Sequence, residues 1–138
     1  MIRVVVDTNV FVSSFFGGPP RKIVNLWKSG QVLLCLSKPI IEEYVEVLRR
    51  LALQDEQELG ELLNVFGRGF HVVFAANTPR LNVVEDDPAD NKFIECAVAL
   101  EAGFIISGDK ALTAIENYMG IKILTPRDFL RYYTASQD

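Results

Sequence analysis

The chain has 138 residues, a formal net charge of −4 at pH 7 and 49% hydrophobic residues. This length suits a single domain over residues 1–138, and the hydrophobic share excludes a disordered chain. The 14 basic residues are scattered along the chain, which argues against a protein that binds nucleic acid through a basic surface alone.

No membrane or export signal is evident in the sequence. No apolar run approaches the roughly 20 residues that a membrane helix needs, and the first residues lead into a strand pattern instead of a signal peptide. Cys35 and Cys96 each stand among apolar residues, as buried thiols do. We therefore expect a cytoplasmic protein that has no contact with a membrane.

Strand-like and helix-like segments alternate along the first half of the chain. A strand over residues 2–6 is followed by a short helix over 10–16, a helix over 21–29 and a strand over 31–36. We expect Gly17–Pro20 to stop the first helix and Gly30 to stop the second. Ser37 is a predicted N-cap for a helix from Lys38 to about Leu53, and a further helix over 55–66 ends at Gly67 or Gly69.

The second half continues the alternation. It has a strand over 70–74, a polar loop over 77–86, a helix from Pro88 to Ala102, a strand over 104–106, a short helix after Asp109, a strand over 121–124 and a helix from Pro126. Repeated βα units predict a three-layer α/β/α sandwich with a mainly parallel central sheet of about five strands.

Acidic residues follow the predicted strands. Asp7 ends the buried Val4–Val6 run, Asp109 comes three residues after Ile106, and Asp90 opens the helix after the third strand. Because parallel strands end at one edge of a sheet, we expect these carboxylates to converge. Glu43 joins them from the helix after the second strand, although its neighbour Glu42 is only slightly less well placed.

Clustered carboxylates predict a metal site. Two ionised groups about 4 Å apart repel by about 4 kcal/mol at an effective dielectric of 20, so they need a counter-charge. Hard oxygen ligands suit Mg²⁺ or Mn²⁺, which activate water and stabilise phosphoryl charge. The single histidine, His71, lies in an apolar run and is expected in a strand, so histidine-based catalysis lacks its parts. A metal-assisted phosphodiesterase is the predicted chemistry.

Several neighbouring residues keep two interpretations. Asp87 precedes Pro88 and suits an N-cap better than catalysis, although it could also join the acids. Thr8, Asn9 and Ser107 are either turn formers or polar supports that hold Asp7 and a bound water. Lys92 and Lys110 are either partners for a phosphate or solvated helix charges.

Four short motifs resemble the PIN-domain family in order and spacing. They are Val4-Val-Val-Asp7-Thr-Asn9, Leu36-Ser37 followed by Glu43, Asp87-Pro-Ala-Asp90-Asn-Lys92 and Ile106-Ser-Gly-Asp109. The similarity runs from about Ile2 into the C-terminal helix and is greatest to the toxin component of prokaryotic toxin–antitoxin pairs.

The resemblance implies a Mg²⁺- or Mn²⁺-dependent endoribonuclease acting on single-stranded RNA. Asp7, Glu43, Asp90 and Asp109 match the family's catalytic and metal-binding acids, and Asn9 and Ser107 match its supporting positions. It also implies a small antitoxin partner and a homo-oligomer, a dimer or larger. Some family members carry a further acid where this chain has Ala111 and Leu112, so the number of metal ions stays open.

Two other functions compete with this one. Haloacid-dehalogenase-type phosphohydrolases also place a nucleophilic Asp after the first strand, but they carry a second Asp where this chain has Asn9. The other alternative is a non-catalytic module that binds RNA or an antitoxin on the same scaffold.

Overall fold

The computed structural model describes residues 1–50 and 56–136. It has six strands: β1 (Arg3–Val6), β2 (Leu33–Ser37), β3 (Val72–Ala75), β4 (Phe104–Ile106), β5 (Asn117–Tyr118) and β6 (Ile121–Leu124). The α-helices are α1 (Thr8–Ser13), α2 (Gly18–Lys28), α3 (Lys38–Arg50), α4 (Glu56–Arg68), α5 (Asn91–Ala99), α6 (Lys110–Thr113) and α7 (Pro126–Ser136). Two 3₁₀ helices, η1 (Ser14–Phe16) and η2 (Pro88–Asp90), complete the described elements. The predicted end of a helix near Leu53 and the predicted start of another at residue 55 lie outside the described residues.

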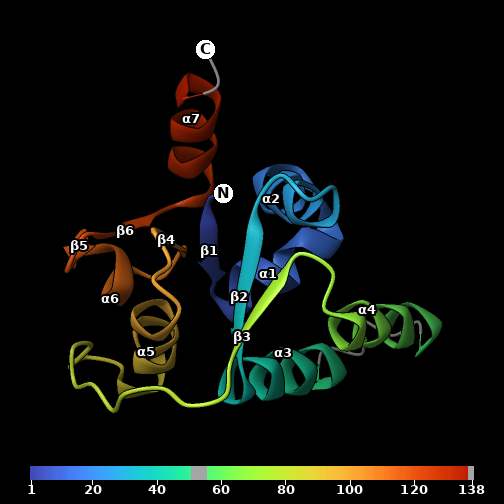
Figure 1. Cartoon of the computed structure of the whole chain (residues 1–138), viewed down its shortest axis with the longest axis horizontal. Helices are drawn as coiled ribbons and strands as arrows, with labels where there is room; N and C mark the ends of the chain where they lie inside the picture. The colour runs from blue at the N-terminus through green and yellow to red at the C-terminus, as the bar shows by residue number, and fades with distance from the viewer. Residues whose placement is uncertain (51–55, 137–138) are drawn as a thin grey trace.

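One mainly parallel sheet organises the chain, as predicted. Its strand order is β3-β2-β1-β4-β6-β5, and every pair is parallel except β5 with β6. Helices cover both faces, with α5 and α6 on one side and α1, α2 and α4 on the other (Figure 1). Because β1 to β4 and β6 point the same way, their carboxyl ends share one edge. That edge is where the predicted acids should meet.

The sheet has six strands instead of about five. The additional strand, β5, is two residues long and pairs with β6 through a hairpin whose loop is Met119–Gly120. Both loop residues have positive φ, 51° for Met119 and 86° for Gly120, which suits the right-handed twist of a hairpin. A two-residue strand leaves no alternating pattern in the sequence, so this element was missed.

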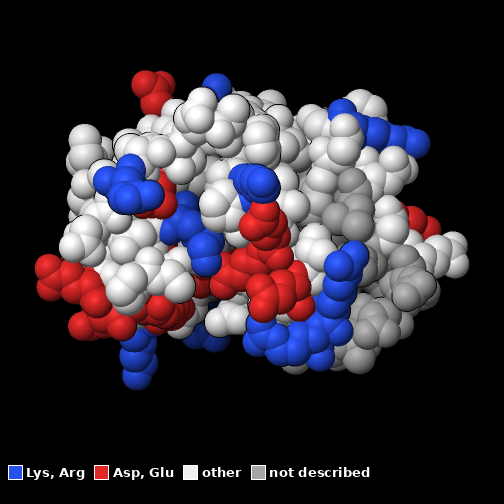
Figure 2. All heavy atoms as spheres, turned by 90° about the horizontal axis from the view of Figure 1, so that it is seen from below, with Lys and Arg blue, Asp and Glu red and all other residues white. Residues whose placement is uncertain are grey.

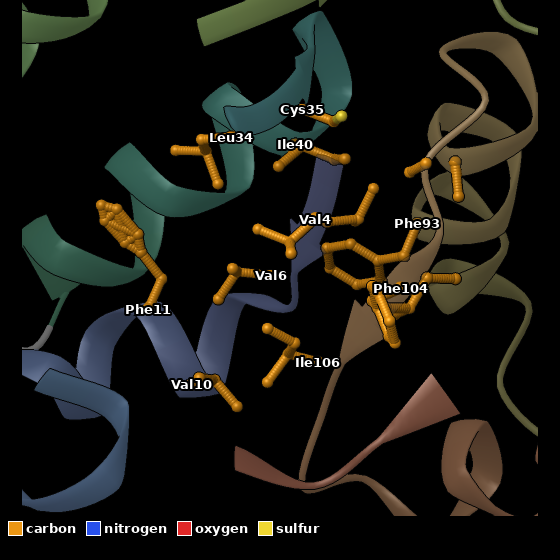
Figure 3. Packing of buried hydrophobic residues seen from close by; sticks show 14 of the residues in the cluster. Val4, Val6, Val10, Phe11, Leu34, Cys35, Ile40, Phe93, Phe104 and Ile106 are labelled. Atoms are coloured by element: carbon orange, nitrogen blue, oxygen red, sulfur yellow. The ribbon is translucent and has the colours of Figure 1, made fainter. Parts of the chain in front are cut away.

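The core is built around β1. Val4, Val5 and Val6 are at most 2% exposed, which fits a strand covered on both faces. In Figure 3, Val4 and Val6 lie between Phe11 of α1 on one side and Phe93 of α5 on the other. Residue Asp7 therefore leaves the most buried strand of the sheet with little freedom to move.

Several predicted boundaries are wrong, each for a local reason. The first helix begins at Thr8 instead of residue 10, because Asp7 caps it, and it turns into η1 at Ser14. The Gly17–Pro20 run does not merely stop a helix. Gly18, Pro19 and Pro20 form the first turn of α2, where the missing proline N–H groups cost nothing. The predicted helix over 88–102 divides into η2 and a shorter α5.

His71 is not a strand residue. Its φ is 57°, in the left-handed region, and β3 begins only at Val72. The imidazole packs against Gly30, whose φ is +80°. A Cβ at Gly30 would lie 2.7 Å from His71 Nε2. The chain after α2 can therefore approach the start of β3 this closely only with glycine at position 30.

The described helices give no membrane span. None of the helices within residues 1–50 and 56–136 combines the length and the low charge that crossing a bilayer requires.

Gly30→Ala should destabilise the protein by about 1–2 kcal/mol, because a side chain at positive φ is strained. Chemical denaturation of the variant and the parent measures this difference. The imidazole contact adds to the cost, so Gly30→Ala with His71→Ala should recover part of the loss but not all of it.

Gly103→Ala is the matched control. A Cβ at Gly103 meets no atom within 4 Å, and its φ is not in the left-handed region, so this change should stay within about 0.5 kcal/mol. Equal effects of the two alanine substitutions would contradict the account of Gly30.

Candidate metal centre

Asp7 is fixed at the end of β1. Its backbone N–H donates to the carbonyl of Ile106 on β4 at 3.0 Å, and its Oδ1 accepts a hydrogen bond from Val10 N at 2.8 Å, which caps α1. The side chain is buried, with 3% of the residue exposed. Strand pairing and helix capping together hold this carboxylate at the carboxyl edge.

Ser107 connects the ends of two strands. Its hydroxyl donates to Asp7 Oδ2, and Ser107 Oγ also accepts a hydrogen bond from Asp109 N at 2.9 Å. Ser107 is completely buried. The hydroxyl therefore joins Asp7 of the β1 end to Asp109 of the β4 end.

Three carboxylates come together beside this link. Asp87, Asp90 and Asp109 each offer an oxygen, and the three oxygens lie within 4.8 Å of one another. Asp109 also caps α6, because its Oδ1 accepts from Ala111 N at 2.9 Å. The predicted N-cap position of Asp87 is confirmed, for η2, but its side chain makes no capping hydrogen bond and lies in the acidic group.

The electrostatics show how closely these acids are packed. Burial, a hydrogen bond to Asp109 and the charges of neighbouring acids, Asp7 among them, raise the pKa of Asp90 to about 8. The same hydrogen bond, received from Asp90, lowers the pKa of Asp109. Burial raises the pKa of Asp7, although hydrogen bonds from Ser107 and Val10 oppose this. The pKa of Asp90 is therefore raised while that of its neighbour Asp109 is lowered, so Asp90 is the acid of this pair that resists ionisation.

Glu43 lies near this cluster but belongs to a separate ion pair. Its Oε2 is 2.7 Å from Lys92 Nζ on α5, and the two side chains are 30% and 20% exposed. Glu42 is more exposed and pairs with Lys38 at 3.8 Å on the surface of α3. The structure thus separates the two glutamates that the sequence left nearly equivalent, and Lys92 neutralises the inner one.

Thr8 and Asn9 do not bond to Asp7. Thr8 is buried, and its hydroxyl has no hydrogen-bond partner within the described residues. Asn9 is exposed on α1, where it lines an open cavity. Of the three residues considered as polar supports, Ser107 is the one that contacts the Asp7 carboxylate.

Two positioning residues were not identified from the sequence. Tyr44 is completely buried on α3 and donates its hydroxyl to the carbonyl of Val6, directly before Asp7. Asn91 folds the preceding loop back onto α5. Its Oδ1 accepts from Val83 N at 2.9 Å and Val84 N at 2.8 Å, and its Nδ2 donates to Pro88 O at 3.0 Å.

The sequence contains only a weak signal for these two roles. A tyrosine in an apolar stripe indicates that a buried hydroxyl needs a partner, and an asparagine at a helix start indicates local backbone bonding. Neither pattern identifies the partner.

The donor set fits a divalent cation. Asp90 Oδ2 is buried, and no described atom donates a hydrogen bond to it, so an acceptor faces the cluster without a partner. Carboxylate oxygens are the ligands that Mg²⁺ and Mn²⁺ prefer. Figure 2 shows a group of Asp and Glu side chains in the middle of the face at the carboxyl edge and another at the lower left, with Lys and Arg side chains directly beside the central group. The residues present therefore suit such an ion.

Comparison with known proteins agrees with the fold and the acidic edge. The sequence profile described as PIN domain matches residues 3–111. The uncharacterized protein MJ1680 of Methanocaldococcus jannaschii is 32% identical over 146 aligned residues, which cover 96% of this chain and 92% of that protein.

Asp90→Asn should stabilise the metal-free protein, and more at pH 8 than at pH 5. Because the native pKa of Asp90 is raised to about 8, the native state keeps a proton that the unfolded state loses near pH 4. The stability of the parent therefore falls as pH rises from about 4 to about 8, and an amide at this position removes that loss. The melting temperature in chelator should rise by a few degrees, on the order of 3 °C per kcal/mol.

Glu101→Gln is a control for the removal of one negative charge. Glu101 is exposed and lies between α5 and the start of β4, at the opposite edge of the sheet. It should show no such pH-dependent gain. A melting temperature of Asp90→Asn that stays below that of the parent at pH 8 would contradict the crowding of these acids.

Proposed function

Because the chain belongs to the PIN-domain family, we propose that it is a metal-dependent endoribonuclease that hydrolyses single-stranded RNA. PIN domains are typically metal-dependent nucleases, and the acids of this chain are consistent with such an active site. The observation that carries the proposal is the group of three carboxylates, Asp87, Asp90 and Asp109, joined to Asp7 through Ser107.

Asp87, Asp90 and Asp109 would hold the ion, and Asp7 is joined to Asp109 through Ser107. Glu43, which pairs with Lys92, is a further candidate ligand. A bound Mg²⁺ or Mn²⁺ would supply a Lewis acid for a phosphate and would make water a stronger nucleophile at neutral pH. Three segments of the chain would supply the carboxylates around the ion. Asp7 leaves β1, Asp109 leaves β4, and Asp90 precedes α5.

The surroundings of Asp7 do not favour covalent phosphoryl transfer. Both carboxylate oxygens accept hydrogen bonds, Oδ1 from Val10 N and Oδ2 from Ser107, and the residue is 3% exposed. A carboxylate nucleophile needs a free oxygen facing the substrate. This geometry agrees better with a role for Asp7 in metal binding than with a role as nucleophile.

The narrower proposal is that the protein is the toxin of a toxin–antitoxin pair and forms homo-oligomers. It is supported by the order and spacing of the four sequence motifs. In this proposal, a small antitoxin protein restrains the nuclease inside the cytoplasm.

The purified protein should cleave single-stranded RNA with Mn²⁺ or Mg²⁺ and lose this activity in chelator. Asp7→Asn and Asp90→Asn should each lower the rate roughly 100-fold or more, since even partners behind a metal ligand account for about 10–100-fold. Cleavage of a labelled oligonucleotide measures this effect.

Glu101→Gln should cleave like the parent, because it removes a carboxylate from the opposite edge. Mn²⁺ should also raise the melting temperature of the parent more than that of Asp7→Asn. Full activity of either Asp variant, or of the parent after complete chelation, would show that these acids do not carry metal-dependent hydrolysis.

The toxin role predicts a growth effect and a genetic neighbour. Induced expression of the parent in a bacterial host should arrest growth, and Asp90→Asn should not. Coexpression of a small DNA-binding protein encoded next to this gene should restore growth. Normal growth with active nuclease present, and no such neighbouring gene, would favour a housekeeping nuclease.

A further inference from the structure

An open cavity of about 640 Å³ lies beside the acidic cluster. Three polar side chains line it, Asn9, Ser13 and Lys110, together with Asp109 and the rings of Pro20 and Pro126. They come from α1, α2, the β4–α6 turn and the start of α7. Segments distant in sequence therefore meet around one space at the carboxyl edge.

The polar groups of this cavity are not used within the protein. Among the described residues, the side chains of Asn9, Ser13 and Lys110 make no hydrogen bond or ion pair. Asn9 and Ser13 are four residues apart on α1 and so lie on the same helix face. An amide, a hydroxyl and an ammonium group thus remain available to a ligand.

Lys110 is notable because of its neighbours. It directly follows Asp109, yet it forms no ion pair with any described carboxylate, whereas Lys38 and Lys92 each pair with a glutamate. Lys110 is exposed and lines the cavity. Because Lys110 pairs with none of the described acids, its positive charge is available to an anion that enters from solvent.

Asp109 is shared between the cavity and the acidic cluster, since it lines the first and contributes an oxygen to the second. A phosphate held at the cluster would therefore have the next unit of its chain at the cavity mouth. The proline rings offer flat apolar surface to a base, and the amide and hydroxyl groups suit the polar edge of a base or a ribose.

We propose that this cavity holds the nucleotide next to the scissile phosphate, with Lys110 against a backbone phosphate of the RNA strand. The inference rests on the proposed nuclease function and adds a substrate site to it. Asn9 then serves the substrate instead of supporting Asp7, and Lys110 sets affinity without taking part in metal binding.

The test measures binding of a labelled hexauridylate to variants built on Asp7→Asn, which prevents cleavage. Lys110→Met should weaken binding about threefold or more, and the slope of log affinity against log salt should become shallower by about 0.7, the value for one lost contact to a single-strand phosphate. Ser13→Tyr, which fills the cavity, should also weaken binding. On the wild-type background, Lys110→Met should not weaken Mn²⁺ binding, because it removes a positive charge and no metal ligand.

Lys28→Met is the matched control, because Lys28 is exposed at the end of α2, near the opposite edge of the sheet. It should alter neither the affinity nor the salt slope. If Lys110→Met and Ser13→Tyr bind RNA as Lys28→Met does, while the parent cleaves RNA, the cavity is not a substrate site. If the parent neither binds nor cleaves RNA, the proposed function itself fails.

Discussion

Repulsion among carboxylates at one edge of the sheet is the constraint on which the site depends. Oxygens of Asp87, Asp90 and Asp109 lie within 4.8 Å of one another, and the pKa of Asp90 is raised to about 8. A protein gains no stability from such an arrangement, because each acid opposes ionisation of the next. A divalent cation would relieve this repulsion, so the arrangement is costly to the fold by itself and consistent with a metal site.

The rest of the fold holds these acids in place against that repulsion. Tyr44 bonds to the backbone before Asp7, Ser107 ties Asp7 to the β4 end, and Asn91 pins the loop that leads to Asp90. All three are buried, so their hydrogen bonds are shielded from water and costly to break. Lys92 compensates the charge of Glu43 at the margin. The placement of the acids therefore depends on buried residues, two of which, Tyr44 and Asn91, are not identified from the sequence.

The sequence could predict the parts that depend on pattern. An unbroken valine run marks β1 as central, and short distances from strand to acid place Asp7 and Asp109 at the same edge. It could not separate capping from clustering at Asp87, because a carboxylate before proline suits both, and only the path of the loop decides. It also misplaced His71, because an apolar run looks continuous in sequence although the left-handed turn at His71 breaks it. The two-residue β5 is too short to show any period.

The most direct test of the metal site is the anomalous diffraction of manganese in crystals equilibrated with Mn²⁺. We expect a peak bound by the carboxylates of Asp90 and Asp109, with Asp7 and Asp87 beside it, and no equivalent peak in Asp90→Asn. Saturating Mn²⁺ that leaves this edge without a peak, or that binds only elsewhere on the protein, would contradict it.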